Sequence, residues 1–184
     1  QDIPRHRQCD GTTVGEPLMN IFVLHPMPDV AARMQCDKHV SKMTLETAQM
    51  LCTVINELGG TSPYKSAHVN HPCSVWARQT MGNFMWLWEH GMALANEYTD
   101  RYGKVHKSEA VIRHCRKAIK DVAWLGGPSF KSRKVTSHPL CMPDEYKTDD
   151  AVESYRRFYI GEKAGFAQWN KTTEAPSWWP KGGE

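Results

Sequence analysis

The chain has 184 residues, 40% of them hydrophobic, which is long enough for a single domain with a substantial core. Its formal net charge is only +3, from 23 Lys and Arg against 20 Asp and Glu. No apolar run is long enough to span a bilayer and no signal-peptide core occurs near the N-terminus, so we expect an intracellular protein without a membrane partner.

The N-terminal region divides at Met19. Residues 1–18 lack hydrophobic periodicity and carry scattered Pro, Gly and Thr, so we expect a flexible or non-native extension. Residues 19–24, Met-Asn-Ile-Phe-Val-Leu, are typical of a natural start followed by a short strand or extended segment. Residues 19–184 are then expected to form one helical domain.

Helical periodicity dominates the rest of the chain. Asp29, Ser108 and Asp149 are the expected N-caps of three helices, and the first of these helices is expected to bend near Cys36-Asp37. The last helix is expected to be interrupted at Gly161. The predicted helices cover residues 30–58, 74–98, 108–125 and 150–160, and residues 128–143 are expected to form an irregular basic loop. The sequence therefore predicts a mainly α-helical, compact bundle of about four to five helices.

One face of the first predicted helix carries a column of polar side chains. Lys38, Lys42 and Glu46 recur at four-residue steps, and His39 lies beside them. A solvated face with a Lys42–Glu46 ion pair is one interpretation. The other is a catalytic set, because an amine can attack the anomeric carbon of a nucleoside while a carboxylate stabilises the cationic transition state. The candidate catalytic residues are Glu46, Lys42, Lys38 and His39.

A second candidate lies at residues 68–78, which contain His68, His71, Cys73 and Arg78. One interpretation is a zinc site that draws on His68, His71 and Cys73, with Cys36 and His39 elsewhere, although the spacing matches no standard zinc motif. The corresponding zinc-dependent enzyme would use the trio His68, His71 and Cys36. Another is that His68, His71 and Arg78 contact nucleic acid. The six cysteines are widely spread without a Cys-x-x-Cys pair, so reduced and mostly buried thiols are expected.

A third candidate is a block of basic residues between positions 101 and 134. Ten Lys and Arg oppose only Glu109 and Asp121, and aromatic residues are interleaved, a pattern that favours a nucleic-acid partner over an ordinary solvated face. The predicted nucleic-acid contacts here are Arg101, Lys104, His106, Lys107, Arg113, Arg116, Lys117, Lys120, Lys131, Arg133 and Lys134. The absence of a phosphate-binding Gly-rich loop, a Gly-x-Ser-x-Gly elbow and a paired-Asp cation loop argues against kinases, α/β-hydrolases and EF-hand proteins.

Four motifs resemble those of a family of small phage-type proteins. They are Met-Asn-Ile-Phe at 19–22, Asp-Lys-x-Val-x-Lys-Met-x-Leu-Glu-x-Ala-Gln at 37–49, His-Pro-Cys-x-x-Trp-x-Arg at 71–78 and Tyr-Gly-Lys-x-His-Lys-Ser at 102–108. Through this family the chain resembles the pyrimidine-dimer DNA glycosylases of the phage endonuclease type. That resemblance implies a small helical DNA-acting enzyme without a cofactor, in the cytoplasm of a bacterial host.

The resemblance also assigns roles. Glu46 would be the catalytic glutamate, and Lys38, His39, Lys42 and Arg78 would surround the DNA. The phage glycosylases use the α-amine of an N-terminal threonine as nucleophile. Here Met19-Asn20 stands at that place. Both a lysine and a terminal amine are therefore candidates for the nucleophile. The predicted function is a repair N-glycosylase, either with or without an additional AP-lyase activity. The alternatives are a non-enzymatic DNA- or RNA-binding phage accessory protein and the zinc-dependent enzyme.

Overall fold

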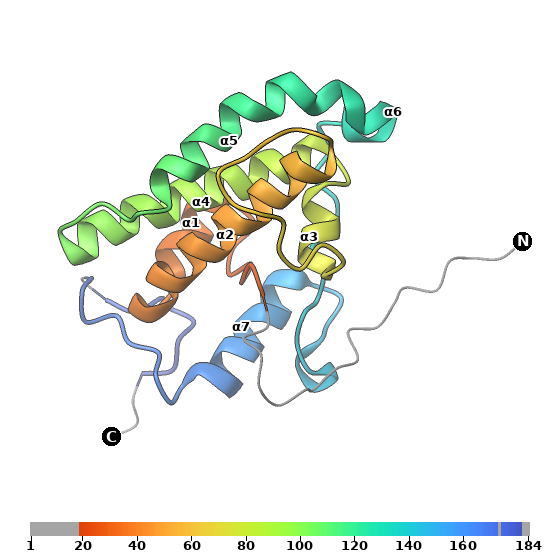
Figure 1. The fold of residues 1–184 in the computed structure, drawn as a ribbon. Coiled ribbons are helices and arrows are strands. Elements are labelled where there is room, and N and C mark those ends of the chain that lie inside the picture. The colour runs from red at the N-terminus through yellow and green to blue at the C-terminus, as the bar shows by residue number, and fades with distance from the viewer. Residues whose placement is uncertain (1–18, 173, 182–184) are drawn as a thin grey trace, which may run out of the picture.

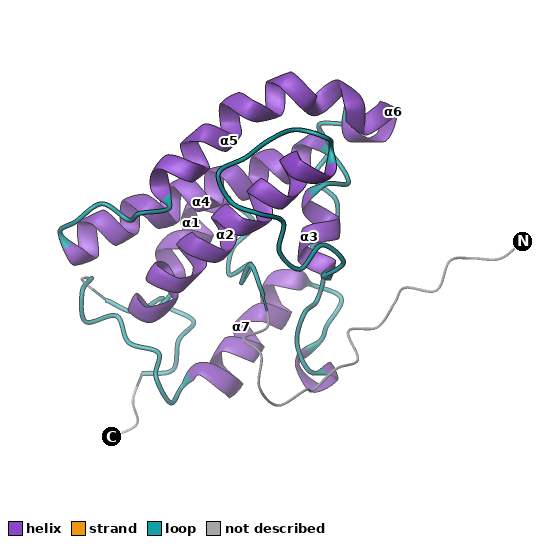
Figure 2. Ribbon diagram, in the orientation of Figure 1, coloured by secondary structure: helices purple, strands orange, loops and turns teal. Residues whose placement is uncertain are grey.

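The structure is a computed structural model that describes residues 19–172 and 174–181; the extension expected at residues 1–18 lies outside them. Throughout this part of the chain the fold consists of helices and loops, with no β-strand (Figures 1 and 2). The helices are α1 (Pro28–Met34), α2 (Asp37–Glu57), α3 (Pro72–Ala77), α4 (Met81–Tyr102), α5 (Glu109–Val122), η1 (Ala123–Gly126), α6 (Gly127–Phe130), η2 (Asp144–Tyr146) and α7 (Ala151–Lys163), where η marks a 3-10 helix. None of these helices combines the length and apolarity that crossing a membrane requires.

The mainly helical prediction is confirmed, and the core lies around α2 and α4. Helix α2 packs against α3, α4 and α5, while α4 also packs against α1 and α5 (Figure 1). Apolar side chains at three- and four-residue steps on α2, among them Val40, Met43, Leu51 and Val54, are almost completely buried. This burial supplies the main hydrophobic stabilisation of the helix that carries the polar column.

Of the two forms expected for the N-terminal segment, a short strand or an extended segment, the structure has the extended segment. Residues 19–24 are buried but pair with no other strand in the described structure, and Phe22 has a φ of 57°, which breaks regular strand geometry. The Phe22 ring stacks on His39 of α2 and packs edge-on against Tyr159 of α7. Arg156 of α7 also donates from Nε to the carbonyl oxygen of Leu24 at 2.9 Å. The segment therefore joins α7 to the core.

The predicted bend near Cys36-Asp37 is a complete break between α1 and α2. Gln35 and Cys36 are extended, and Arg101 donates to the carbonyl oxygens of Arg33 and Gln35, which accept no bond from a following turn of α1. Helix α1 begins at Pro28 rather than after Asp29, because proline at the first helical position has a preorganised φ and needs no N–H partner.

Four other features of the helices differ from the prediction. The second predicted helix divides into α3 and α4 at Thr80, whose hydroxyl caps α4. Asp150, not Asp149, caps α7, because its carboxylate accepts from the Glu153 backbone N–H at 2.7 Å. Helix α7 continues through Gly161, and α6 occupies the first residues of the segment that was expected to be an irregular loop.

Candidate functional site

Glu46 is the buried end of the polar column on α2. Its side chain is only 10% exposed, its Oε2 accepts from the backbone N–H of Asn20 at 3.3 Å, and its Oε1 lies 3.6 Å from Lys42 Nζ. Burial raises the pKa of Glu46, while the Lys42 charge and the Asn20 N–H oppose that rise only in part. The column is therefore not a uniformly solvated face, since its carboxylate lies against the extended segment.

His39 is also buried, in contact with Phe22 of the extended segment and Tyr159 of α7. Its Nδ1 is 2.7 Å from the Tyr159 hydroxyl, and its ring stacks on Phe22 at a centroid distance of 4.5 Å. Burial, and then the positive charges of Lys163, Lys42 and Lys38, lower the pKa of His39 to about 3. The imidazole is therefore neutral at neutral pH. Its position allows it to pack against Phe22 and to orient the Tyr159 hydroxyl.

An open cleft of about 860 Å³ lies beside the N-terminal turns of α2. Lys38 Nζ stands 4.8 Å from the centre of the Phe166 ring, and Lys171 Nζ stands 4.8 Å from the centre of the Tyr102 ring. The residues that line the cleft are Asp37, Lys38, Ser41, Lys42, Tyr102, Phe166, Gln168, Asn170 and Lys171. Cations next to aromatic faces can bind phosphates and unstacked bases.

Several residues of this region were not predicted from the sequence. Phe166 and Lys171 belong to a C-terminal segment without helical periodicity, and Asn20 was noted only as part of the start motif. Lys163, at the end of α7, lies over the Phe158 ring at 4.6 Å, and burial, together with the charge of Lys42, lowers its pKa although Glu162 opposes this. The alternation of lysine and aromatic residues after residue 162 is the one signal that could have indicated them.

Some of the residues predicted to contact nucleic acid make hydrogen bonds within the protein. Arg101 is only 7% exposed, and its guanidinium donates to Glu97, Asp37 and two backbone carbonyls, so the prediction that it contacts phosphate is corrected. His106 Nε2 lies 3.1 Å from the Ser41 carbonyl oxygen. Arg78 donates to the Val69 carbonyl oxygen at 2.5 Å, which stabilises the loop before α3.

None of the remaining cations of the basic block lines the cleft. Those with exposed side chains are Lys104, Lys107, Arg113, Lys117, Lys120, Lys131, Arg133 and Lys134, whereas Arg116 is partly buried near the Trp88 ring. Ser132 accepts from the backbone N–H of Gly82 at the start of α4, while Tyr102 and the cleft are at its end. At 1.5 Å per residue these two ends are about 30 Å apart, so the basic residues form an extended surface.

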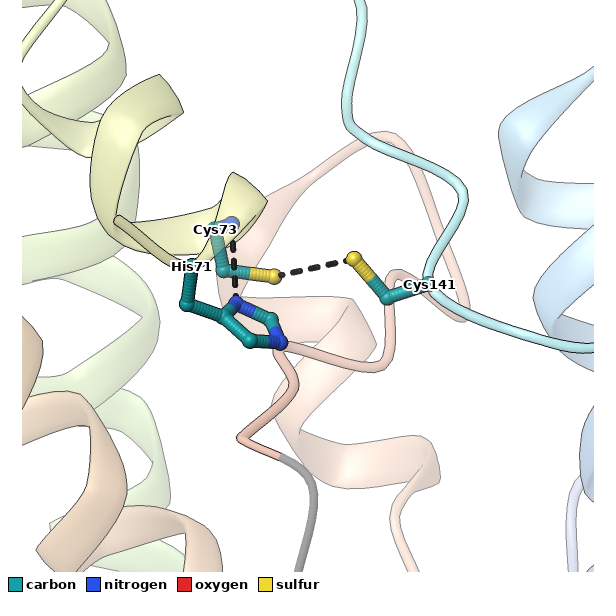
Figure 3. A group of neighbouring side chains, drawn as sticks. All are labelled: His71, Cys73 and Cys141. Carbon is teal, nitrogen blue, oxygen red and sulfur yellow. Dashed lines mark hydrogen bonds between the residues drawn. The ribbon is translucent and has the colours of Figure 1, made fainter. Parts of the chain in front are cut away.

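A separate cluster contains His71, Cys73 and Cys141 (Figure 3). Their metal-ligating atoms all lie within 4.8 Å of one another. In the described part of the chain no other group of three or more such side chains is this close, so the predicted trio of His68, His71 and Cys36 does not form. Cys36 instead lies beside Tyr159, whose hydroxyl is 3.3 Å from its Sγ.

The other cysteines agree with the prediction of buried thiols. Cys36, Cys52, Cys73 and Cys115 are fully buried, and Cys141 is partly exposed. Cys52 and Cys115 have their sulfur atoms 3.7 Å apart inside the core. Cys9 lies outside the described residues.

The family comparison covers the part of the chain that holds Glu46. Residues 19–110, half of the chain, match a family model described as pyrimidine dimer DNA glycosylase. This range includes Asn20, Lys42 and Glu46, whereas Cys141 and the cleft residues Phe166 and Lys171 follow it. Searches of curated proteins and of solved structures give no match.

Proposed function

Because the chain belongs to the pyrimidine dimer DNA glycosylase family, we propose that it excises a damaged pyrimidine from DNA, with Glu46 as the catalytic carboxylate. The observation that carries this proposal is the position of the buried Glu46 carboxylate, 3.3 Å from Asn20 N and 3.6 Å from Lys42 Nζ. A carboxylate beside an amine is the pair that imine-forming base excision requires.

Glu46 has two tasks in this reaction. An amine attacks C1′ of the deoxyribose, the C1′–N bond to the base breaks, and the base leaves with the bonding electrons. The ionised carboxylate stabilises the positive charge that develops on the sugar. Because burial raises its pKa, Glu46 is also a stronger base than an exposed glutamate and can accept the proton that the attacking amine loses.

Two nitrogen atoms lie close enough to Glu46 to be the nucleophile. Lys42 Nζ is an amine in the chain as given, and its side chain is 42% exposed. Asn20 N is a backbone amide in this chain and becomes an α-amine only in a chain that begins at Asn20. Such an α-amine has an ordinary pKa of about 7.7–8.0 against about 10.4 for lysine, so far more of it is unprotonated at neutral pH. We assign Lys42 in the full chain and the α-amine in a chain that begins at Asn20.

After attack by either amine, the C1′–O4′ bond breaks, O4′ takes up a proton, and a protonated imine joins the enzyme to C1′ of the opened sugar. Loss of a proton from C2′ then breaks the C3′–O bond and releases the 3′ phosphate, which is the AP-lyase step. The cleft with Lys38, Lys171, Tyr102 and Phe166 is placed to bind the DNA backbone and an unstacked base near the start of α2.

The test uses a duplex with a single thymine dimer. Wild-type protein should break one C1′–N bond of the dimer, which leaves the base attached to its neighbour and an abasic sugar in the strand, or should also cut the strand, and borohydride should trap a covalent protein–DNA adduct. Glu46→Gln should lower the rate by at least about 100-fold, the usual effect of losing a charge-stabilising group, because the amide keeps the shape and the Asn20 contact but not the charge.

Matched variants separate the two nucleophiles. Lys42→Ala should remove the adduct of the full chain, whereas Lys65→Ala, an exposed lysine outside the cleft, should not. In a chain that begins at Asn20 the adduct should persist in Lys42→Ala and map to residue 20. A Glu46→Gln protein with wild-type activity on dimer-containing DNA would overturn the assignment of Glu46.

A further inference from the structure

His71, Cys73 and Cys141 come together from two segments that are distant in the sequence. His71 and Cys73 lie at the start of α3, and Cys141 lies in the irregular segment before η2. Figure 3 shows the imidazole and the two thiol groups turned toward a common space between these segments. Their ligand atoms lie within 4.8 Å of one another, and the two sulfur atoms are 3.7 Å apart.

The sulfur–sulfur distance of 3.7 Å is close to the edge of a tetrahedral zinc site. Zinc–sulfur bonds of about 2.3 Å at tetrahedral angles place two sulfur atoms about 3.8 Å apart. The pair Cys52 and Cys115 has the same 3.7 Å separation, but no third ligating side chain of the described chain joins it within reach. The distance by itself therefore does not identify a site, whereas the additional imidazole does.

We propose that His71, Cys73 and Cys141 bind one zinc ion. Two thiolates and one imidazole are ligands that zinc prefers over harder cations such as magnesium or calcium. Because His71 and Cys141 are partly exposed, a water molecule or another donor can complete the tetrahedron. His71 Nδ1 accepts from the Cys73 backbone N–H at 3.1 Å, and metal binding at either ring nitrogen replaces this single capping bond.

The site has a structural consequence for the region of Glu46. The Cys141 carbonyl oxygen accepts from Asn20 Nδ2 at 2.9 Å, and Asn20 N in turn donates to Glu46. A metal ion that fixes Cys141 to α3 therefore also fixes Asn20 beside the carboxylate. This positioning role rests on the proposed function, whereas metal binding itself does not.

The test is a cobalt(II) and zinc titration of the full chain, reduced and stripped of metal with a chelator. One cobalt ion per chain should bind and produce the visible bands of a tetrahedral site together with thiolate-to-metal absorption in the near ultraviolet. One equivalent of zinc should abolish these bands. Zinc should also protect Cys141 from alkylation, measured by mass spectrometry on the unaltered protein.

Variants identify the ligands without any activity measurement. Cys141→Ser and His71→Asn should each weaken zinc binding by more than about 100-fold, beyond the loss expected for a partner that only supports a ligand. Asparagine retains a capping acceptor at position 71. Cys52→Ser is the matched control and should keep one tight site. The proposal is overturned if the wild-type chain binds no tetrahedral cobalt, if Cys52→Ser weakens binding as much as Cys141→Ser, or if zinc leaves the alkylation of Cys141 unchanged.

Discussion

Acidification should destabilise this fold steeply, because three histidines, the buried His39 and His90 and the partly buried His138, resist protonation. The pKa is lowered to about 3 for His39 and to about 4 for His90 and His138. Burial is the main cause in each case. The charges of Lys163 and other lysines add to it for His39, the charge of His90 adds to it for His138, and backbone contacts oppose it for His90.

The sign and size of the effect follow from proton linkage. In the unfolded chain these histidines titrate at about 6.5, so between that pH and the folded pKa the unfolded state binds more protons and stability falls as the pH falls. Each group then removes about 1.4 kcal/mol of unfolding free energy per pH unit, or about 2 kcal/mol at pH 5. Three groups remove about 6 kcal/mol at pH 5, within the range of total stability of a domain.

Urea unfolding followed by circular dichroism between pH 5 and pH 7.5 measures this slope. The wild-type slope between pH 5 and pH 6 should approach about 4 kcal/mol per pH unit, and His39→Gln should reduce it by about 1.4. His114→Gln alters an exposed side chain and should leave the slope unchanged. An unaltered slope in His39→Gln would show that His39 is protonated inside the folded protein, and the account of its burial would fail.

Three further outcomes are expected. Glu46→Gln should be more stable than wild type in urea at pH 8, and this difference should close toward pH 4. The reason is that the pKa of Glu46 is raised in the folded protein, so the wild type loses stability as the pH rises through that pKa. A variant that is less stable than wild type at pH 8 would contradict this. Gly82→Ala should lower stability by about 1–3 kcal/mol in the same urea assay, since its Cβ would lie 2.3 Å from the carbonyl oxygen of Arg133, and an unchanged midpoint would refute that close approach. Joint replacement of Lys38 and Lys171 by alanine should weaken binding of fluorescent duplex DNA and reduce the slope of log affinity against log salt by about 2; an unchanged slope would exclude the cleft as a phosphate site.

Helical periodicity was sufficient to predict the helical class and the central helix with its polar column. Near Cys36 the sequence predicted only a bend within one helix, whereas the backbone at Gln35 and Cys36 is extended and separates α1 from α2. That break depends on Arg101, which is 66 residues from Gln35 in the sequence and donates to its carbonyl oxygen. A long-range contact of this kind leaves no periodic signal in a single sequence.

The same limit explains which site residues were found. Lys42 and Glu46 share a helix, so their spacing predicted the ion pair. Asn20 and Cys141 meet across 121 residues, and His71 and Cys73 find their third neighbour, Cys141, only through tertiary packing. The basic block was predicted to be one surface because its residues are close in the sequence. In the structure, its first residues lie at the end of α4 or just after it, and its last residues lie near the start of α4.

The position of Asn20 unites the extended segment with the chemistry of α2. Its side-chain oxygen accepts from the Ile21 N–H at 2.8 Å, its amide group donates to Cys141, and its backbone N–H donates to Glu46. Three directional bonds leave the residue little rotational freedom, and Phe22 anchors the following backbone against α7. In a chain that begins at Asn20, an α-amine held in this way beside the Glu46 carboxylate is preorganised as the nucleophile, since little of its orientation must be ordered when DNA binds. The buried segment before α1 is therefore as much a part of the proposed active site as the helix that carries Glu46.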